Sequence, residues 1–311
     1  MNHVVITGAD GFIGRNLCRL LTERGIYVTA LIMQNNNRRE SISAFNNLTI
    51  IECDYMHLSM YEPQIEKSPD AFIHLAWDGV RPQDRESLSV QLPNIELALN
   101  VLRFASNIKT KKFILPGSTM EYLYNDEIIC GEDVPTPQNI YGATKVATRH
   151  LCEVLSRQLK LPFIYTIFTG VYGPDRRDNN VIFHVIDSLL NGESPELTAL
   201  EQKWDYVHID DLVSALLAIC EYGKSGACYP IGHGDNVSLF YYVNIIHALI
   251  RPDIPLGIGK ISYATKTLPS SCVDISSLYK DTGFKPRIEF KQGIVDVINA
   301  IKVKKAGSEK K

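Results

Sequence analysis

One tyrosine and one lysine of this chain have the spacing that acid–base chemistry requires. Tyr141 and Lys145 lie four residues apart, so they share one face if the segment is helical. An ammonium beside a phenol favours the phenolate and lowers the pKa of the tyrosine. The helix dipole acts in the same direction, because Tyr141 would lie in the first helical turn. We therefore expect Tyr141 to donate or accept a proton near neutral pH.

Two hydroxyl side chains stand at the end of an apolar run and could meet the same substrate. Ser118 comes soon after the strand-like segment 112–116, and Thr119 is the next residue. Either hydroxyl could hydrogen-bond the substrate oxygen to which Tyr141 gives its proton. The alternative for the pair itself is a surface tyrosine beside a solvated lysine.

A glycine-rich turn, TGADGFIG at 7–14, is the second motif. An apolar run precedes it and apolar residues at helical spacing follow it, which predicts a strand, a turn and a helix. The first amides of such a helix point at the turn and favour a bound phosphate there. Gly8 would permit the tight turn, Gly11 the approach of a pyrophosphate, and Gly14 close packing of the helix on the strand. A purely structural turn is the alternative.

Strands and helices alternate along the first 170 residues, and these elements must place both motifs. The expected strands cover 4–7, 27–33, 48–53, 71–76, 112–116 and 163–168. Helices are expected after the glycine turn as far as Arg24, at 94–106 and at 141–159. The alternation predicts an α/β fold with a doubly wound parallel sheet. Such sheets bind ligands at the carboxyl ends of their strands, where both motifs stand.

After Gly170 the alternation is lost, which predicts a smaller second lobe. Residues 1–169 are assigned to the dinucleotide-binding domain, to which 204–235 return with a strand at 204–209. Residues 170–203 and 236–303 would form the interleaved C-terminal lobe. Asp210 and Asp211 are expected to cap the helix that follows them. The lysine-rich end, 304–311, is expected to be a frayed, solvated tail.

Composition excludes several functional classes. The 311 residues are 45% hydrophobic with a net charge of −3, and no basic cluster indicates nucleic-acid binding. No apolar run reaches about 18 residues, and a core strand starts at once, so we expect neither a membrane span nor a signal peptide. The seven cysteines form no CxxC pair and are expected to be free thiols in a reducing cytoplasm. The eight histidines lack ligand spacing, so no metal site is expected.

With these motifs the chain resembles the extended short-chain dehydrogenases/reductases of the sugar-nucleotide epimerase/dehydratase family. Beyond the glycine turn and Asp54, the matching stretches are HLAW at 74–77, GSTMEY at 117–122, YGATK at 141–145, VYGP at 171–174, DYVHIDD at 205–211 and TGFKP at 282–286. They cover most of the chain in the family's order. The resemblance implies a Rossmann-like fold, a C-terminal lobe that binds a nucleotide-sugar, and a homodimer.

The resemblance also implies roles for individual residues. Ser118, Tyr141 and Lys145 would be the catalytic set, and Tyr141 and Lys145 would also flank the nicotinamide ribose. Further cofactor contacts are implied for Gly8, Gly11, Phe12, Ile13, Gly14, Asp54, Leu75 and Ala76. Substrate contacts are expected for Thr119, Arg176, Arg177, Asn180 and Lys203.

Several of these residues have a simpler alternative. Arg176, Arg177 and Lys203 suit a diphosphate, arginine through its bidentate fork, but they could equally be charges on a solvated loop. Asn180 could cap a helix instead. Arg85 is expected mainly on the surface and Trp77 mainly in the core.

The second strand favours NADP(H) over NAD(H). An NAD site of this fold usually has an acidic residue at the end of that strand, which bonds the ribose 2′-hydroxyl. Here the strand ends in Met33-Gln34, and no acidic residue precedes Glu40. Arg38 and Arg39 could instead meet the 2′-phosphate of NADP(H), although they could equally be solvated charges on a loop.

Together with the family resemblance, these features predict a cytoplasmic, NADPH-dependent reductase of the 4-keto group of a nucleotide-linked (dTDP-, CDP-, GDP- or UDP-) 6-deoxyhexose, in deoxysugar biosynthesis for surface polysaccharide. The related 4,6-dehydratases carry an Asp-Glu pair directly after the hydroxyl residue, where this chain has Thr119 and Met120, and Glu121 is one residue late. The alternatives are a nucleotide-sugar epimerase with tightly bound NAD, and a non-catalytic cofactor-binding protein.

Overall fold

The computed structural model describes residues 1–34, 38–65, 68–122, 128–174, 176, 180–263 and 270–308. Its central sheet consists of β1 (His3–Thr7), β2 (Tyr27–Met33), β3 (Leu48–Cys53), β4 (Ala71–His74), β5 (Phe113–Ser118), β6 (Phe163–Phe168) and β10 (Cys228–Ile231). Over the described residues these seven strands follow the order β10-β6-β5-β4-β1-β2-β3. Every pairing among them is parallel. The predicted α/β doubly wound sheet is confirmed, and the crevice for a ligand lies where the order reverses, between β1 and β4.

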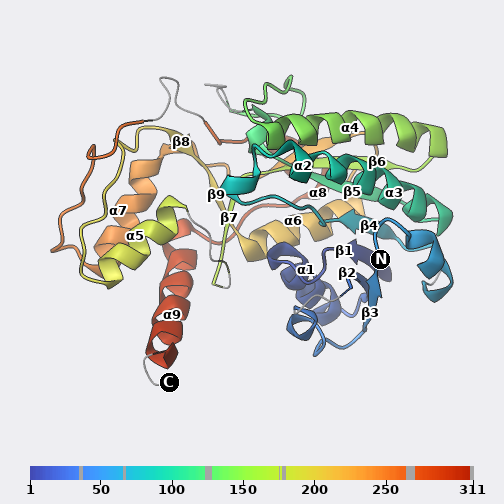
Figure 1. Cartoon of the computed structure of the whole chain (residues 1–311), viewed down its shortest axis with the longest axis horizontal. Helices are drawn as coiled ribbons and strands as arrows, with labels where there is room; N and C mark the ends of the chain where they lie inside the picture. The colour runs from blue at the N-terminus through green and yellow to red at the C-terminus, as the bar shows by residue number, and fades with distance from the viewer. Residues whose placement is uncertain are drawn as a thin grey trace.

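Helices cover both faces of the sheet, which explains why β1, β4 and β6 are buried at every position (Figure 1). One face carries α1 (Phe12–Glu23), α6 (Ile209–Tyr222) and α8 (Ser276–Thr282). The other carries α3 (Pro93–Asn107) and α4 (Ile140–Leu159), with the short α2 (Leu88–Gln91) beside them. Short 3-10 helices join these elements: η1 (Arg39–Ser41), η2 (Leu58–Gln64), η3 (Pro82–Asp84) and η4 (Thr119–Tyr122).

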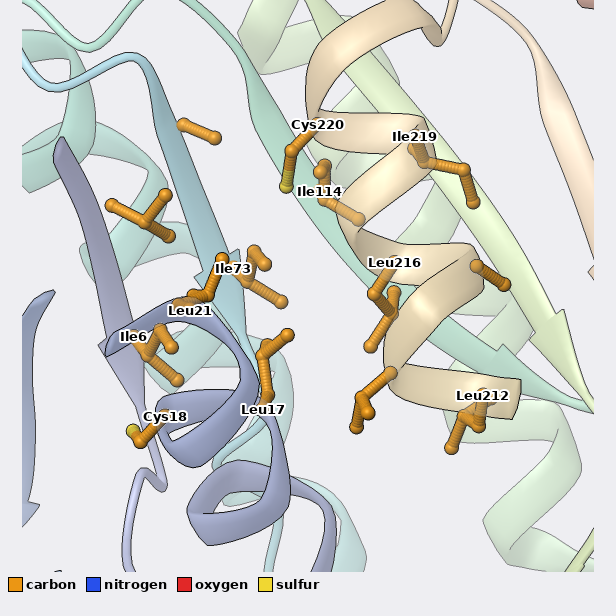
Figure 2. Close-up of a cluster of buried hydrophobic side chains, with 14 of the residues drawn as sticks. Ile6, Leu17, Cys18, Leu21, Ile73, Ile114, Leu212, Leu216, Ile219 and Cys220 are labelled. Carbon is orange, nitrogen blue, oxygen red and sulfur yellow. The ribbon is translucent and has the colours of Figure 1, made fainter. Parts of the chain in front are cut away.

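The apolar face of α1 packs against α6 and the sheet (Figure 2). Its buried residues Leu17, Cys18 and Leu21 recur at helical spacing. They join a cluster that includes Ile6, Ile73, Ile114, Leu212, Leu216, Ile219 and Cys220. Burial of one such side chain is worth roughly 1.5–3 kcal/mol. This packing fixes the start of α1 at the carboxyl ends of the strands.

A second lobe lies at one end of the molecule, away from β1–β3 (Figure 1). Its helices, α5 (Val181–Leu190), α7 (Leu239–Ile250) and α9 (Phe290–Ser308), share a core with Tyr172, Tyr206 and Tyr242. Two small two-stranded sheets lie outside the central sheet. They pair β7 (Gly170–Tyr172) with β9 (Tyr206–His208), and β8 (Lys203–Trp204) with β11 (Val237–Ser238).

Two predicted boundaries are wrong. The strand expected at 204–209 is divided at Asp205, because β8 and β9 pair with different strands and the buried Asp205 carboxylate accepts hydrogen bonds from the loop after β10. The tail expected at 304–311 is helical as far as Ser308, and Lys305 Nζ donates to Asn191 Oδ1 at 2.8 Å. Residues 309–311 lie outside the described part of the chain.

The predicted capping of α6 by the acidic pair is also wrong. His208 Nδ1 accepts the hydrogen bond from Asp210 N instead, at 3.2 Å. Asp211 is buried, and its carboxylate accepts from Arg287 N and Ile288 N at 2.9–3.1 Å. Asp211 therefore fastens the segment between α8 and α9 to the sheet domain.

We predict that Asp211→Ala lowers the free energy of unfolding by about 3 kcal/mol, because it leaves two backbone N–H groups without their charged acceptor. Asp210→Ala is the matched control. Asp210 pairs with Arg19 at 2.7 Å, but both side chains are more than 40% exposed, so its loss should cost no more than about 1 kcal/mol. Urea unfolding of both variants decides the matter, and equal losses would contradict the assignment.

Candidate active site

Backbone contact between the ends of β1 and β4 frames the site. Leu75 N donates to Thr7 O at 3.1 Å, and a Cβ added to Gly8 would lie 2.8 Å from Ala76 N. Gly8 also has a φ of +67°, which L-residues with side chains rarely adopt. A Cβ on Gly14 would lie 2.2 Å from the Gly8 carbonyl oxygen. The two glycines are thus required by the backbone itself.

The start of α1 suits the pyrophosphate of a dinucleotide. Gly11 is the N-cap residue and offers no side chain to occupy the helix end. The amides of Phe12, Ile13 and Gly14 belong to the first turn, where an α-helix supplies no acceptor for them. Free amides together with the positive end of the helix dipole attract phosphate. The glycine turn therefore fits the cofactor that the sequence predicts.

Tyr55 stabilises this turn, and sequence analysis missed it. Its hydroxyl donates to Leu31 O at 2.8 Å and accepts from Gly8 N at 3.0 Å, and the side chain is buried. The contact joins residues 47 positions apart, so no local pattern could reveal it.

The structure brings Ser118, Tyr141 and Lys145 together where β5 ends beside the start of α4. Ser118 is the last residue of β5; its Oγ accepts from Met120 N at 3.2 Å, and its side chain is near enough to Tyr141 to lower the pKa of the phenol. Tyr141 lies in the first turn of α4, as expected, behind the capping residue Asn139. Lys145 Nζ donates to Pro116 O at 3.1 Å. The catalytic roles of these side chains remain a prediction.

Burial, and not Lys145, dominates the pKa of the phenol. Tyr141 is 8% exposed, and burial raises its pKa to about 12 against the opposing effects of Arg85 and Ser118. Lys145 is 6% exposed, and burial lowers its pKa to about 7. The expectation that Lys145 makes Tyr141 acidic is wrong for the chain by itself, because the ammonium lies 5.8 Å from the phenol ring centroid. Tyr141 consequently keeps its proton at neutral pH.

Glu121 lies directly beneath Ser118. Its Oε1 accepts from Ser118 N at 2.7 Å and from the Tyr165 hydroxyl at 2.8 Å. The side chain has no exposed surface, and burial raises its pKa to about 7. A carboxyl group in this position supports the end of β5 and has no surface with which to meet a substrate.

Two arginine side chains, those of Arg85 and Arg176, lie beside aromatic rings of the site. The Arg85 guanidinium lies 5.7 Å from the Tyr141 ring centroid, and Arg85 O accepts from Tyr141 N at 2.9 Å. The Arg176 guanidinium lies 5.4 Å from the Phe12 ring centroid and donates to Val171 O at 2.9 Å. Arg176, a predicted substrate residue, is thus placed between the glycine turn and the second lobe, and Arg85 joins the site contrary to expectation.

The other predicted substrate residues are more dispersed. Thr119 is buried and shares a 2.7 Å hydrogen bond with Ser271 Oγ, which competes with its expected contact to substrate. Asn180 caps α5 with its side chain, and Lys203 is exposed on β8. Arg177 lies outside the described residues. Substrate binding by these residues remains a prediction.

The residues expected near the adenosine half lie at the ends of β2 and β3. Asp54 follows β3, is exposed, and accepts from His57 Nδ1 at 2.7 Å, which lowers its pKa. Arg38 and Arg39 are exposed beyond β2, and Arg39 Nη1 bonds Glu52 Oε1 of β3 at 2.6 Å. A carboxylate already engages one of the two arginines expected at the 2′-phosphate.

No group of three or more His, Cys, Asp or Glu side chains is arranged to hold a metal ion in the described ranges. All seven cysteines are free. Within those same ranges, no helix combines the length and the apolar character needed to cross a bilayer.

Comparison with protein families identifies the family to which this chain belongs. Residues 4–232 match the model of the NAD dependent epimerase/dehydratase family. The chain belongs to this family. The match runs from β1 to the end of β10, so it includes the glycine turn, Ser118 and the Tyr141–Lys145 pair.

Two curated relatives align over nearly the full chain. CDP-abequose synthase of Salmonella typhimurium is 26% identical over 96% of this chain and 98% of its own. A dTDP-4-dehydro-6-deoxyglucose reductase of Escherichia coli is 23% identical over 97% of this chain and 98% of its own. Other relatives are named as 4,6-dehydratases and as a 4-epimerase, so the relatives span several reactions.

Among solved structures, UDP-glucuronic acid 4-epimerase from Bacillus cereus has a TM-score of 0.83 at 22% identity. The similarity covers 96% of this chain and 99% of the epimerase, which was solved in complex with UDP-glucuronic acid and NAD. It shows that both lobes share the fold of this epimerase.

We predict that Tyr55→Phe destabilises the protein by about 1–2 kcal/mol, because both hydrogen bonds of its hydroxyl are lost, while Gly8 N keeps its 3.1 Å bond to Leu31 O. Binding of NADH and NADPH should weaken severalfold, since the amides around the turn lose their support. Tyr27→Phe is the control, because within the described residues its hydroxyl bonds the exposed Thr49 hydroxyl alone, at 2.7 Å. Unfolding curves and calorimetric titrations of both variants test this, and unchanged cofactor affinity in Tyr55→Phe would refute it.

Proposed function

We propose that the protein is an NADPH-dependent reductase of the 4-keto group of a nucleotide-linked 6-deoxyhexose, acting in deoxysugar biosynthesis for surface polysaccharide. The observation that carries this proposal is Tyr141, a buried phenol that keeps its proton beside Ser118 while no acidic pair follows that serine. Relatives named CDP-abequose synthase and dTDP-4-dehydro-6-deoxyglucose reductase, aligned over almost their whole length, support it further.

The chain's own groups would divide the work of carbonyl reduction. NADPH, when bound, supplies the hydride that reaches the sugar carbon. Ser118 orients the carbonyl oxygen, and Tyr141 gives its proton to that oxygen as negative charge develops there. Lys145 holds a positive charge near the phenolate that Tyr141 then becomes, and it binds the nicotinamide ribose.

Elimination of water, the reaction of the related dehydratases, needs an acid and a base that face the sugar. The positions after Ser118 are Thr119, which is bonded to Ser271, and Met120. Glu121 is fully buried against Ser118 N and Tyr165. These placements favour reduction over dehydration.

The decisive experiment incubates the protein with NADPH and dTDP-, CDP-, GDP- and UDP-linked 4-keto-6-deoxyhexoses, and follows the nicotinamide absorbance. One of these substrates should oxidise NADPH stoichiometrically. Tyr141→Phe should retain NADPH binding but lose about 10²- to 10⁴-fold in kcat, because it lacks only the transferable proton.

Three outcomes would overturn the proposal. Near-normal turnover by Tyr141→Phe would remove the assigned acid. Purification with bound NAD, together with interconversion of hydroxyl epimers without added cofactor, would identify an epimerase. Cofactor binding without turnover of any sugar nucleotide would favour a non-catalytic protein.

The choice of NADP(H) rests on the end of β2. No acidic side chain follows Met33 among the described residues before Glu40, while Arg38 and Arg39 are exposed there. Arginine bonds a phosphate well through paired N–H groups. The nearby Glu52 carboxylate competes for Arg39.

We therefore predict opposite effects of two substitutions on NADPH affinity. Arg39→Ala should weaken NADPH binding roughly tenfold, because one charge-assisted contact to the 2′-phosphate is lost. Glu52→Gln should strengthen it, because Arg39 is released from its partner. NADH is the control ligand, and calorimetry should show little change in its affinity for either variant. Tighter binding of NADH than of NADPH by the unaltered protein would reverse the assignment.

A further inference from the structure

The ammonium group of Lys145 has an unusual neighbour. A lysine offers three N–H donors, and the hydrogen-bond partner of Nζ within the described chain is the Pro116 carbonyl at 3.1 Å. The same nitrogen lies 3.4 Å from the centroid of the Trp77 ring. A cation at this distance from an indole face is attracted by its quadrupole, most strongly when water is excluded. Trp77 lies in the loop after β4, whereas Lys145 lies on α4.

Trp77 is held in place by buried amides. Its Nε1 donates to Gln91 Oε1 at 3.1 Å, and Gln91 Nε2 in turn donates to Gly79 O at 2.8 Å. Asn94 Oδ1 accepts from Asp78 N at 2.8 Å, which fixes the loop immediately after the tryptophan. Gln91 and Asn94 are both buried. The indole is therefore oriented by the ends of α2 and α3, independently of Lys145.

The same ring also borders Tyr141. The two ring centroids lie 6.1 Å apart at an interplanar angle of 80°, which is an edge-to-face arrangement. Trp77 thus touches both members of the Tyr-Lys pair, although the pair motif itself contains no tryptophan.

We propose that Trp77 is a positioning residue for Lys145: its indole face and the Pro116 carbonyl hold the ammonium, in its charged form, behind the Tyr141 phenol. The inference deepens the proposed function, since it rests on the role of Lys145 in that reaction. Sequence analysis assigned Trp77 to core packing, and nothing in the Tyr-Lys spacing could indicate it.

Other charged groups face Lys145 from the elements around it. Glu121, on η4, is the group that favours the ammonium electrostatically. His74, on β4, is bonded to Thr7 and has its pKa lowered to about 3, so it is neutral near pH 7. On the side of the phenol lie Arg85 and Arg176, which act on the pKa of Tyr141. The experiment must therefore distinguish the titration of Lys145 from that of Glu121.

Fluorescence offers a direct test, because the chain has only two tryptophans, Trp77 and Trp204. In a Trp204→Phe background all indole emission comes from Trp77. We expect this emission to titrate near pH 7 as Lys145 gains or loses its proton, and the titration to vanish when Lys145→Met is added. Emission independent of pH between 5.5 and 8.5 would overturn the proposal. So would a transition that survives Lys145→Met and disappears only in Glu121→Gln.

Kinetics supply the second test. Without the indole face the pKa of Lys145 should fall, because the ammonium loses an attraction that offsets the cost of its burial. The alkaline limb of the kcat profile should then move to lower pH, by about one unit for Trp77→Leu and by less for Trp77→Phe, which keeps an aromatic face. A uniform loss of kcat with an unmoved limb in both variants would indicate a merely structural role. The fluorescence titration needs no substrate, so failure of the proposed reduction would leave it intact.

Discussion

The close approach of two backbone segments at the crevice is the constraint on which the site depends. The turn at Gly8 lies against the chain at Leu75 and Ala76, with no room for a Cβ, and Gly14 lies against Gly8 in the same way. This contact sets where α1 begins and therefore where its free amides point. It also fixes the loop after β4, from which Trp77 reaches the Tyr-Lys pair. The glycine turn and the Tyr-Lys pair thus share one framework.

Local patterns were enough to predict the sheet, the glycine turn and the Tyr-Lys pair. Parallel strands buried on both faces are nearly continuous apolar runs, and a four-residue spacing on a helix places two side chains on one face. Ser118 could be added because a strand end is visible in the sequence. These signals lie within a few residues of one another, so the geometry they imply does not depend on the rest of the fold.

Contacts between distant segments could not be predicted. Tyr55 supports Gly8 across 47 residues, and Asp211 holds a segment 76 residues further on. The pKa of Tyr141 was predicted in the wrong direction, because spacing reveals a neighbouring charge but says nothing about burial. The division at Asp205 was missed for a related reason. A strand that changes partners midway has the same apolar pattern as an uninterrupted one.

The interleaved second lobe has a consequence for how the chain is made. Its core joins Tyr172, Tyr206 and Tyr242 to Phe290 and Ile301, so it combines segments that leave the ribosome far apart in time. Domains generally form as units during synthesis, N-terminal parts first. The strands as far as β6 can associate early, whereas the core that α5 and α7 share is completed only by α9, the last helix (Figure 1). Until then the part of this core that α9 covers is exposed, and a chain arrested before Phe290 should be a client for chaperones and prone to aggregate.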